Sequence, residues 1–249
     1  MKILLSLVMM ALFSTGTLAA DGKVYELRVY TAEPGRIADL VTRLQLASQL
    51  FARHGMENVI FWAPFKEKDS GLDKMAYLLG HKSREAAAAS WKAFIADPAW
   101  HKVRDANEAD GKVVTKVDST FLEQTDYSPS ISAGLAKPGA VYELRTYTTP
   151  EGKLKDLDTR FRDHTMKLFA KHGMTNGPYF HPIDADKGAA NTLIYWVTHE
   201  TPESAAAAWA GFREDPVWIK VRDASEVNGK LTTQVKPVYL SRFDLPASE

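Results

Sequence analysis

The chain repeats itself, and this internal duplication limits the folds that it can adopt. Val24 to Tyr30 reads VYELRVY, and 117 positions later Val141 to Tyr147 reads VYELRTY. The closing part of each copy also matches: ADPAWHKVRDANEADGKVVTKV starts at Ala96 and EDPVWIKVRDASEVNGKLTTQV starts at Glu214. The offset between the copies grows from 117 to 118 inside the first expected helix. A duplication of this length predicts two homologous lobes.

The lobes are predicted at residues 21–122 and 141–249. The segment 123–140 between them contains Ser, Pro and Gly, a composition typical of linkers.

Residues 1–20 have the features of a signal peptide. Lys2 precedes an apolar run over 3–13 that is too short to span a bilayer, and the small residues Thr17 and Ala19 follow at the spacing of a cleavage site. We expect cleavage after Ala19 or Ala20 and a periplasmic or secreted protein without a stable membrane anchor; a transmembrane anchor is the alternative.

Each copy shows the same order of elements. An alternating strand is followed by an amphipathic helix, two further strands, an Ala-rich helix, a second helical segment and a closing strand. The predicted helix starts are Ser83, Thr201, Asp97 with Pro98, and Asp215 with Pro216. The order β-α-β-β-α-β is the ferredoxin-like arrangement, with helices on one face of a four-stranded antiparallel sheet.

The third strands indicate how the lobes meet. MAYLLGH (75–81) and LIYWVTH (193–199) are apolar on both alternating faces, which is typical of strands that are buried on both sides. We therefore predict an α+β fold in which two ferredoxin-like lobes face each other sheet to sheet. The result is a dimeric α/β barrel within one chain.

The first strand of each lobe carries a Glu, an Arg and a Tyr on one face and apolar residues on the other. Tyr25, Leu27 and Val29 suit packing against helices, so the polar face is expected to point into the barrel. Buried opposite charges must be paired, so Glu–Arg ion pairs are expected there. The pairs either fix the register of the lobes or orient a small molecule. The ligand-binding candidates are Glu26, Arg28, Tyr30, Glu143, Arg145 and Tyr147.

Three histidines are further candidates. His164 lies on the expected apolar stripe of the second lobe's first helix, as a core residue or as a ligand-binding group. His81 and His199 end the third strands, where they either line the barrel mouth or bond the loop before the next helix. His181 replaces Ala63 of the first lobe, a difference at which the copies could have specialised.

Composition excludes several classes of function. The chain has no Cys, so disulfides, thiol nucleophiles and thiolate metal sites are absent. Lys and Arg number 31, as do Asp and Glu, so no net charge draws the chain to nucleic acid. Metal-binding, hydrolase and dinucleotide-binding motifs are also missing, and no metal or cofactor is expected.

Several motifs together resemble the NIPSNAP family. They are YELRTY (142–147), a helix that begins near Gly152 and ends in HG (172–173), AAAAW (205–209) and DPVW (215–218), and the resemblance covers two copies. It implies a dimeric α/β-barrel fold and no particular reaction. The wider superfamily includes cofactor-free monooxygenases, isomerases and haem enzymes, which is an analogy of fold.

The sequence thus predicts an exported NIPSNAP-like protein that binds a small apolar or aromatic molecule inside the barrel. One alternative is a non-catalytic structural or interaction protein with a filled barrel. Another is a cofactor-free monooxygenase or isomerase, so enzymatic activity is left open. The chain is expected as a monomeric pseudo-dimer or as a homodimer.

Overall fold

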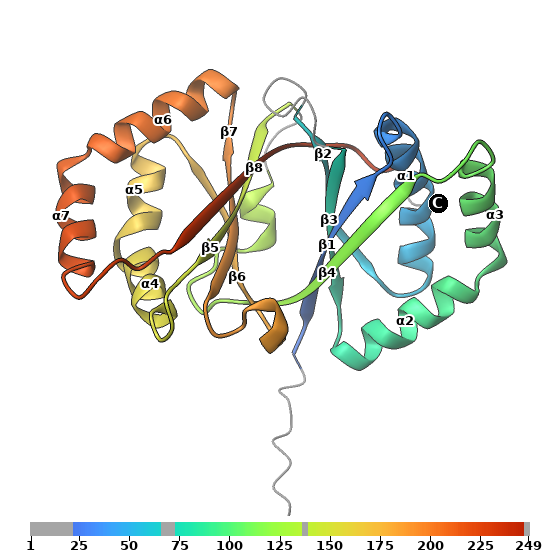
Figure 1. Ribbon diagram of the computed structural model, residues 1–249, viewed down its shortest axis with the longest axis horizontal. Helices are drawn as coiled ribbons and strands as arrows, with labels where there is room; N and C mark the ends of the chain where they lie inside the picture. The colour runs from blue at the N-terminus through green and yellow to red at the C-terminus, as the bar shows by residue number, and fades with distance from the viewer. Residues whose placement is uncertain (1–21, 66–72, 136–138, 247–249) are drawn as a thin grey trace, which may run out of the picture.

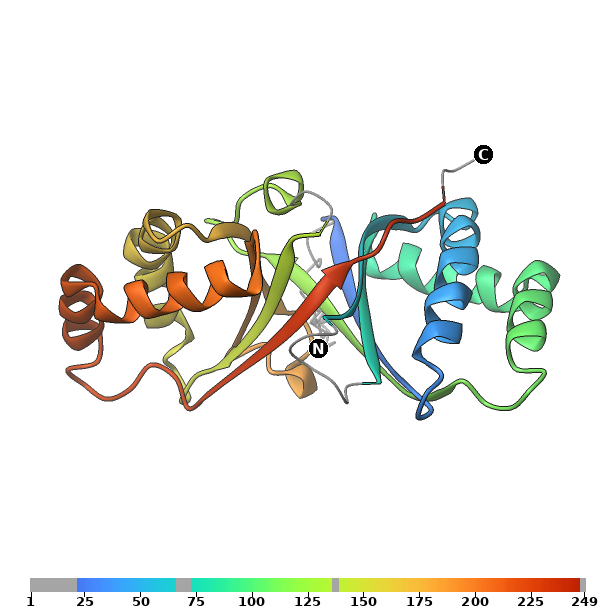
Figure 2. The same cartoon turned by 90° about the horizontal axis from the view of Figure 1, so that it is seen from above.

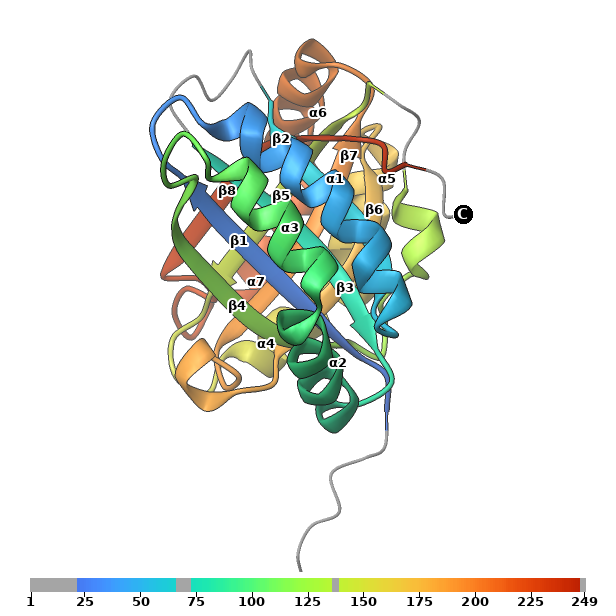
Figure 3. The ribbon, with the colours of Figure 1, turned by 90° about the vertical axis from the view of Figure 1, so that its right-hand side faces the viewer.

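The computed structural model describes residues 22–65, 73–135 and 139–246. The predicted signal peptide at 1–20 lies outside the described residues. Two lobes of the same design lie next to each other, with the sheets in the middle and the helices on the outer sides (Figures 1 and 2). Figure 3 shows α1, α2 and α3 covering the outer face of the first lobe's sheet.

The elements follow the predicted order in both lobes. The first lobe consists of β1 (Val24–Ala32), α1 (Ile37–Arg53), β2 (Glu57–Pro64), β3 (Lys74–His81), α2 (Arg84–Ala96), α3 (Pro98–Asn107) and β4 (Val114–Gln124). A short 3-10 turn, η1 (Ile131–Gly134), precedes the second lobe. The second lobe consists of β5 (Val141–Thr148), α4 (Leu154–Arg160), a π-helical turn η2 (Phe161–Thr165), α5 (Met166–Lys171), β6 (Thr175–Pro182), a 3-10 turn η3 (Ala185–Lys187), β7 (Thr192–His199), α6 (Pro202–Glu214), α7 (Pro216–Ser225) and β8 (Gln234–Arg242).

The helices begin at the predicted residues because their side chains satisfy free backbone amides. Ser83 accepts a hydrogen bond at the start of α2, and Thr201 forms a capping box at the start of α6. Asp97 and Asp215 do the same for α3 and α7, each followed by a proline at the first helical position.

The strands close into a barrel in the order β1-β3-β2-β8-β5-β7-β6-β4. The lobes join where β2 pairs with β8 and β4 pairs with β6. Ala63 lies opposite Ser241 at the first junction, and Glu123 lies opposite His181 at the second. The predicted intramolecular barrel is confirmed.

The barrel interior is filled with apolar side chains from every strand. They are Tyr25, Leu27, Ile60, Trp62, Ala76, Leu78, Leu122, Tyr142, Leu144, Phe180, Ile194, Trp196 and Leu240. The indole rings of Trp62 and Trp196 meet edge-on with centroids 5.2 Å apart, and both residues are at most 1% exposed. Such close aromatic contacts between the lobes stabilise the assembly.

The prediction for the two faces of the first strand is wrong. Tyr25 and Leu27 point into the barrel, whereas Glu26 and Arg28 point towards the helices. Both faces of the sheet are buried. The alternation of side chains along a strand therefore divides them into two sets but does not show which set faces the helices. The barrel interior is lined by apolar groups, whereas the helix-facing side of the sheet contains the donors that a buried carboxylate needs.

Each lobe's last strand continues onto the other lobe. Beyond β4, the Tyr127 hydroxyl donates a hydrogen bond to Asp158 Oδ1 of α4 at 2.7 Å. Beyond β8, the ring of Phe243 packs edge-on against Phe61 of β2, with centroids 5.8 Å apart. In Figure 2 the red C-terminal segment runs from the second lobe across to α1. These two arms tie the lobes together reciprocally.

Candidate functional site

A buried carboxylate lies between the sheet and the second helix of the first lobe. Glu26 is 1% exposed. Its carboxylate accepts hydrogen bonds from Arg28 Nη1 at 2.7 Å, Trp91 Nε1 at 2.6 Å and Ser119 Oγ at 2.6 Å. Glu26 and Arg28 form the predicted ion pair, but the pair faces α2, where Trp91 contacts it, instead of lining the barrel.

The second lobe contains the same cluster, with one donor fewer among the described residues. Glu143 is 0% exposed, pairs with Arg145 and accepts a hydrogen bond from Trp209 Nε1 at 2.5 Å. Pro237 lies opposite Arg145 where the first lobe has Ser119. Because proline has no donor group, Glu143 depends more on Arg145 and Trp209.

Both carboxylates stay ionised near neutral pH. Burial alone raises the pKa of Glu26, but the hydrogen bond from His81 and the charge of Arg28 outweigh it and lower the pKa to about 2. The pKa of Glu143 is lowered for the same reasons. A general base works best with a pKa near the operating pH, so the geometry gives these groups a structural role.

His81 and His199 bind these carboxylates, and neither of the two positions predicted for them is observed. Nε2 of His81 lies 3.1 Å from Glu26 Oε2, and Nε2 of His199 lies 3.2 Å from Glu143 Oε2. Both rings are at most 3% exposed. They share the helix-facing side of the third strands, so they meet the glutamates directly.

Tyr30 and Tyr147 follow Arg28 and Arg145 on the helix-facing side of β1 and β5. Arg145 Nη2 donates to the Tyr147 hydroxyl at 3.0 Å, and the equivalent bond to Tyr30 is 3.4 Å long. The Tyr30 hydroxyl also bonds the Tyr77 hydroxyl at 3.1 Å. Tyr195, the counterpart of Tyr77, is fully buried beside Tyr147, and the two ring centroids are 5.5 Å apart.

The two lobes differ most in their first helix. In the first lobe α1 has 17 residues. The equivalent stretch of the second lobe consists of α4, the π turn and α5, with 7, 5 and 6 residues, and is therefore one residue longer. The Thr165 hydroxyl donates to the carbonyl of Arg160, five residues earlier, at 3.1 Å. The increase of the repeat offset from 117 to 118 therefore corresponds to this turn. Single π turns occur frequently at functional sites.

The π turn also changes the position of His164. A helical period of about 3.6 residues places this side chain on the apolar stripe between Phe161 and Leu168. In the structure His164 is exposed, and Thr165 occupies the inward position that Ala47 has in α1. The predicted position is wrong because the extra residue rotates this part of the helix. His164 lines an outer groove of about 480 Å³ between α4 and α7.

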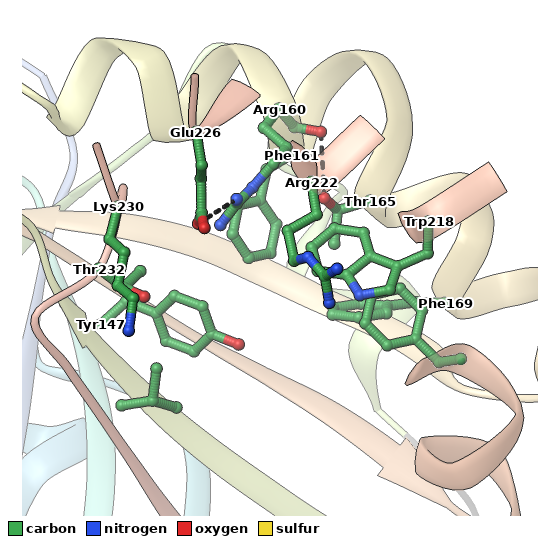
Figure 4. Close-up of a pocket in the computed structure, with 12 residues that line it drawn as sticks. Tyr147, Arg160, Phe161, Thr165, Phe169, Trp218, Arg222, Glu226, Lys230 and Thr232 are labelled. Carbon is green, nitrogen blue, oxygen red and sulfur yellow. Dashed lines mark hydrogen bonds and ion pairs between the residues drawn. The ribbon is translucent and has the colours of Figure 1, made fainter. Parts of the chain in front are cut away.

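A second cavity of about 480 Å³ opens on the inner side of the π turn, between the helices and strands β5 and β8 (Figure 4). Its aromatic wall consists of Phe161, Phe169, Phe212 and Trp218. Its charged groups are Arg160, Arg222, Lys230 and Glu226. Hydroxyl groups of Tyr147, Thr165 and Thr232 complete the polar part. The cavity thus combines an apolar wall with groups that can orient a ligand.

The charges of the cavity leave a positive excess. Arg160 is 5% exposed and donates to Glu226 Oε1 at 2.9 Å, so this pair is internally neutral. Arg222 pairs with its exposed neighbour Asp223 at the rim. Among the described residues Lys230 forms no ion pair. The cavity therefore favours anionic groups.

Of the residues selected from the sequence, Tyr147 lines the inner cavity, with Glu143 and Arg145 directly behind it. Thr165, Arg222 and Lys230 belong to no recognisable motif, and sequence reasoning missed them. The sequence contains one signal for this region: the repeat offset changes from 117 to 118 where the second lobe has its extra residue, and the cavity lies beside that residue.

The described part of the chain contains no group of three or more His, Cys, Asp or Glu side chains arranged to hold a metal ion. Its helices are too short or too polar to cross a membrane.

The closed barrel built from two ferredoxin-like lobes defines a protein of the dimeric α/β-barrel class, with both halves in one chain. The family model for NIPSNAP matches residues 25–129 and 142–243, one match in each lobe. The chain belongs to the NIPSNAP family, as its motifs predicted.

Two solved structures that align with most of this chain agree with this class of fold. A putative monooxygenase from Lactobacillus acidophilus is 12% identical, with a TM-score of 0.57 over 89% of this chain and 94% of its own. A putative monooxygenase from Fusobacterium nucleatum is 8% identical, with a TM-score of 0.54 over 91% and 94%. An uncharacterized NIPSNAP domain protein from Burkholderia xenovorans is 16% identical over 43% of this chain and 99% of its own, with a TM-score of 0.36. No curated protein matches. At these identities the likeness to the two putative monooxygenases concerns the fold alone.

Proposed function

We propose that this NIPSNAP protein binds a small molecule in the inner cavity of its second lobe. The observation that carries the proposal is the cavity itself, about 480 Å³ of space beside a π turn that only the second copy of the repeat has. Ligand sites commonly occupy about 300 to 1,000 Å³ and combine apolar walls with a few polar groups.

The proposal keeps the kind of ligand expected from the sequence but changes its place. Trp62, Trp196 and their neighbours occupy the barrel interior, so the interior serves as the core that joins the lobes. A filled barrel also fits a purely structural protein, but that alternative leaves the second-lobe cavity without a role. The monooxygenase alternative draws only on likeness of fold.

Native mass spectrometry of protein purified from its own host tests the proposal. The wild type is expected to carry a small molecule, and Thr165→Trp, which fills the cavity, is expected to lose it. NMR of the Trp218 indole during a screen of aromatic fragments maps the site. The proposal fails if bound molecules persist in the filled variant. It also fails if no fragment shifts the Trp218 signal at millimolar concentration.

A further inference from the structure

We infer that the ligand of this cavity carries a carboxylate on an aromatic or apolar body, and that Tyr147 and Lys230 bind the carboxylate. The inference rests on the proposed binding function and narrows its ligand class.

The cavity has two chemically different ends. In Figure 4, Tyr147, Lys230 and Thr232 lie at one end, and Phe169 and Trp218 lie at the other. The rings of Phe212 and Trp218 are 4.4 Å apart and extend the apolar end. A molecule that fills the cavity therefore meets hydrogen-bond donors and a cation at one end and aromatic surface at the other.

The phenol of Tyr147 is held in place to donate a proton into the cavity. Glu143 fixes Arg145, and Arg145 Nη2 donates to the Tyr147 oxygen at 3.0 Å. This bond uses a lone pair of the phenol and leaves its O–H group available. The neutral hydroxyl of Tyr195, which interacts with Tyr147, is the other acceptor near this proton. An ionised ligand oxygen is a stronger acceptor than this neutral phenol and would replace it as the partner of the Tyr147 O–H group.

The charge of the expected ligand follows from the cations that remain. Glu226 neutralises Arg160, so this arginine does not need an anionic ligand. Lys230, at the cavity rim, has no carboxylate partner among the described residues. An ionised carboxylate would accept hydrogen bonds from both Tyr147 and Lys230, and charge-assisted bonds of this kind are stronger than neutral ones.

The first lobe supplies matched controls because the repeat places Tyr30 and Lys112 at the equivalent positions. There the Tyr30 hydroxyl already bonds the Tyr77 hydroxyl. The same substitution can therefore be made in both lobes. It removes a proposed ligand-binding group in the second lobe and an equivalent residue without that role in the first.

The test compares 3-phenylpropionate with its uncharged amide, 3-phenylpropionamide, by calorimetry and by NMR of the Trp218 indole in the full-length mature protein. We expect the carboxylate to bind about tenfold more tightly than the amide. Tyr147→Phe is expected to weaken carboxylate binding about tenfold, and Lys230→Met about threefold. Tyr30→Phe and Lys112→Met are expected to change neither affinity.

The outcomes separate the inference from the proposed function. Equal binding of acid and amide, or carboxylate binding that survives both second-lobe substitutions, overturns the inference and leaves small-molecule binding intact. If neither probe shifts the Trp218 signal, both the inference and the proposed cavity fail. Because Lys230 is exposed, its variant will fold and gives an answer even if Tyr147→Phe does not.

Discussion

Glu26 and Glu143 occupy equivalent positions, but different sets of donors surround them. Glu26 has Ser119 in addition to Arg28, Trp91 and His81, whereas Pro237 removes this donor from the second lobe. Losing one partner of a buried ion pair costs more than the pair contributes, because the remaining charge keeps its desolvation penalty. The two lobes should therefore respond unequally to the same substitution.

Arg145→Met is expected to lower the free energy of unfolding by about 3 kcal/mol, because it leaves the buried carboxylate of Glu143 without its permanent cation. Urea denaturation followed by circular dichroism measures the change. Arg28→Met is the matched control, and its loss should be smaller because Ser119 still donates to Glu26. A loss below about 0.5 kcal/mol for Arg145→Met would mean that the pair behaves as an exposed one.

Acid should destabilise the protein through the same carboxylates. The folded-state pKa of Glu26 is about 2, below the ordinary Glu value of 4.5, so its stabilising contribution is present above pH 4.5. That contribution is lost as the pH falls from 4.5 towards 2. Urea titrations at several pH values measure how steeply the free energy of unfolding changes with pH. This dependence should be weaker in Glu26→Gln. An unchanged dependence in this variant would contradict the assignment.

At the level of single elements, the π turn separates two helices that are otherwise alike. Deleting Asp163 should restore a regular helix in phase with α1, close the cavity and abolish ligand binding, with no loss of stability. A crystal structure and the unfolding free energy of the variant check this. Deleting Gln45 from α1 is the control, since it shifts a regular helix out of phase and should destabilise the fold strongly.

The elements differ in how far sequence could predict them. Helix starts are local, so Ser83 and Asp97 could be recognised from their own neighbours. The face of β1 that enters the barrel depends on the other lobe, and alternation alone cannot decide it. The same holds for β4, which continues to Gln124 because strand β6 of the other lobe pairs with it. The extra residue was visible as a shift in offset, but its effect on His164 and Thr165 required the structure.

For the whole molecule, the barrel core and the two arms make each lobe depend on the other. Residues 139–249 produced alone would expose the half-barrel that contains Tyr142 and Trp196. We expect this fragment to form a homodimer and to form a one-to-one complex with residues 21–135 when the two are mixed. Light scattering after size-exclusion chromatography measures both, and a stable monomeric fragment would contradict this view of the barrel.

Export is a prediction for the whole chain that rests on its first twenty residues. The mature protein isolated from its host is expected to begin at Ala20 or Asp21 in the periplasm or the medium. Intact-mass spectrometry identifies the first residue. A mature protein that still begins at Met1 in the cytoplasm would refute the prediction.

The π turn occurs in one lobe only, and this is possible because both lobes belong to the same polypeptide. In a barrel made from two identical subunits, an inserted codon would appear twice, and any harm to assembly would be doubled with it. A tandem gene removes that constraint. One half can preserve the ancestral scaffold while the other accumulates changes, so new chemistry should be sought wherever the halves have ceased to match.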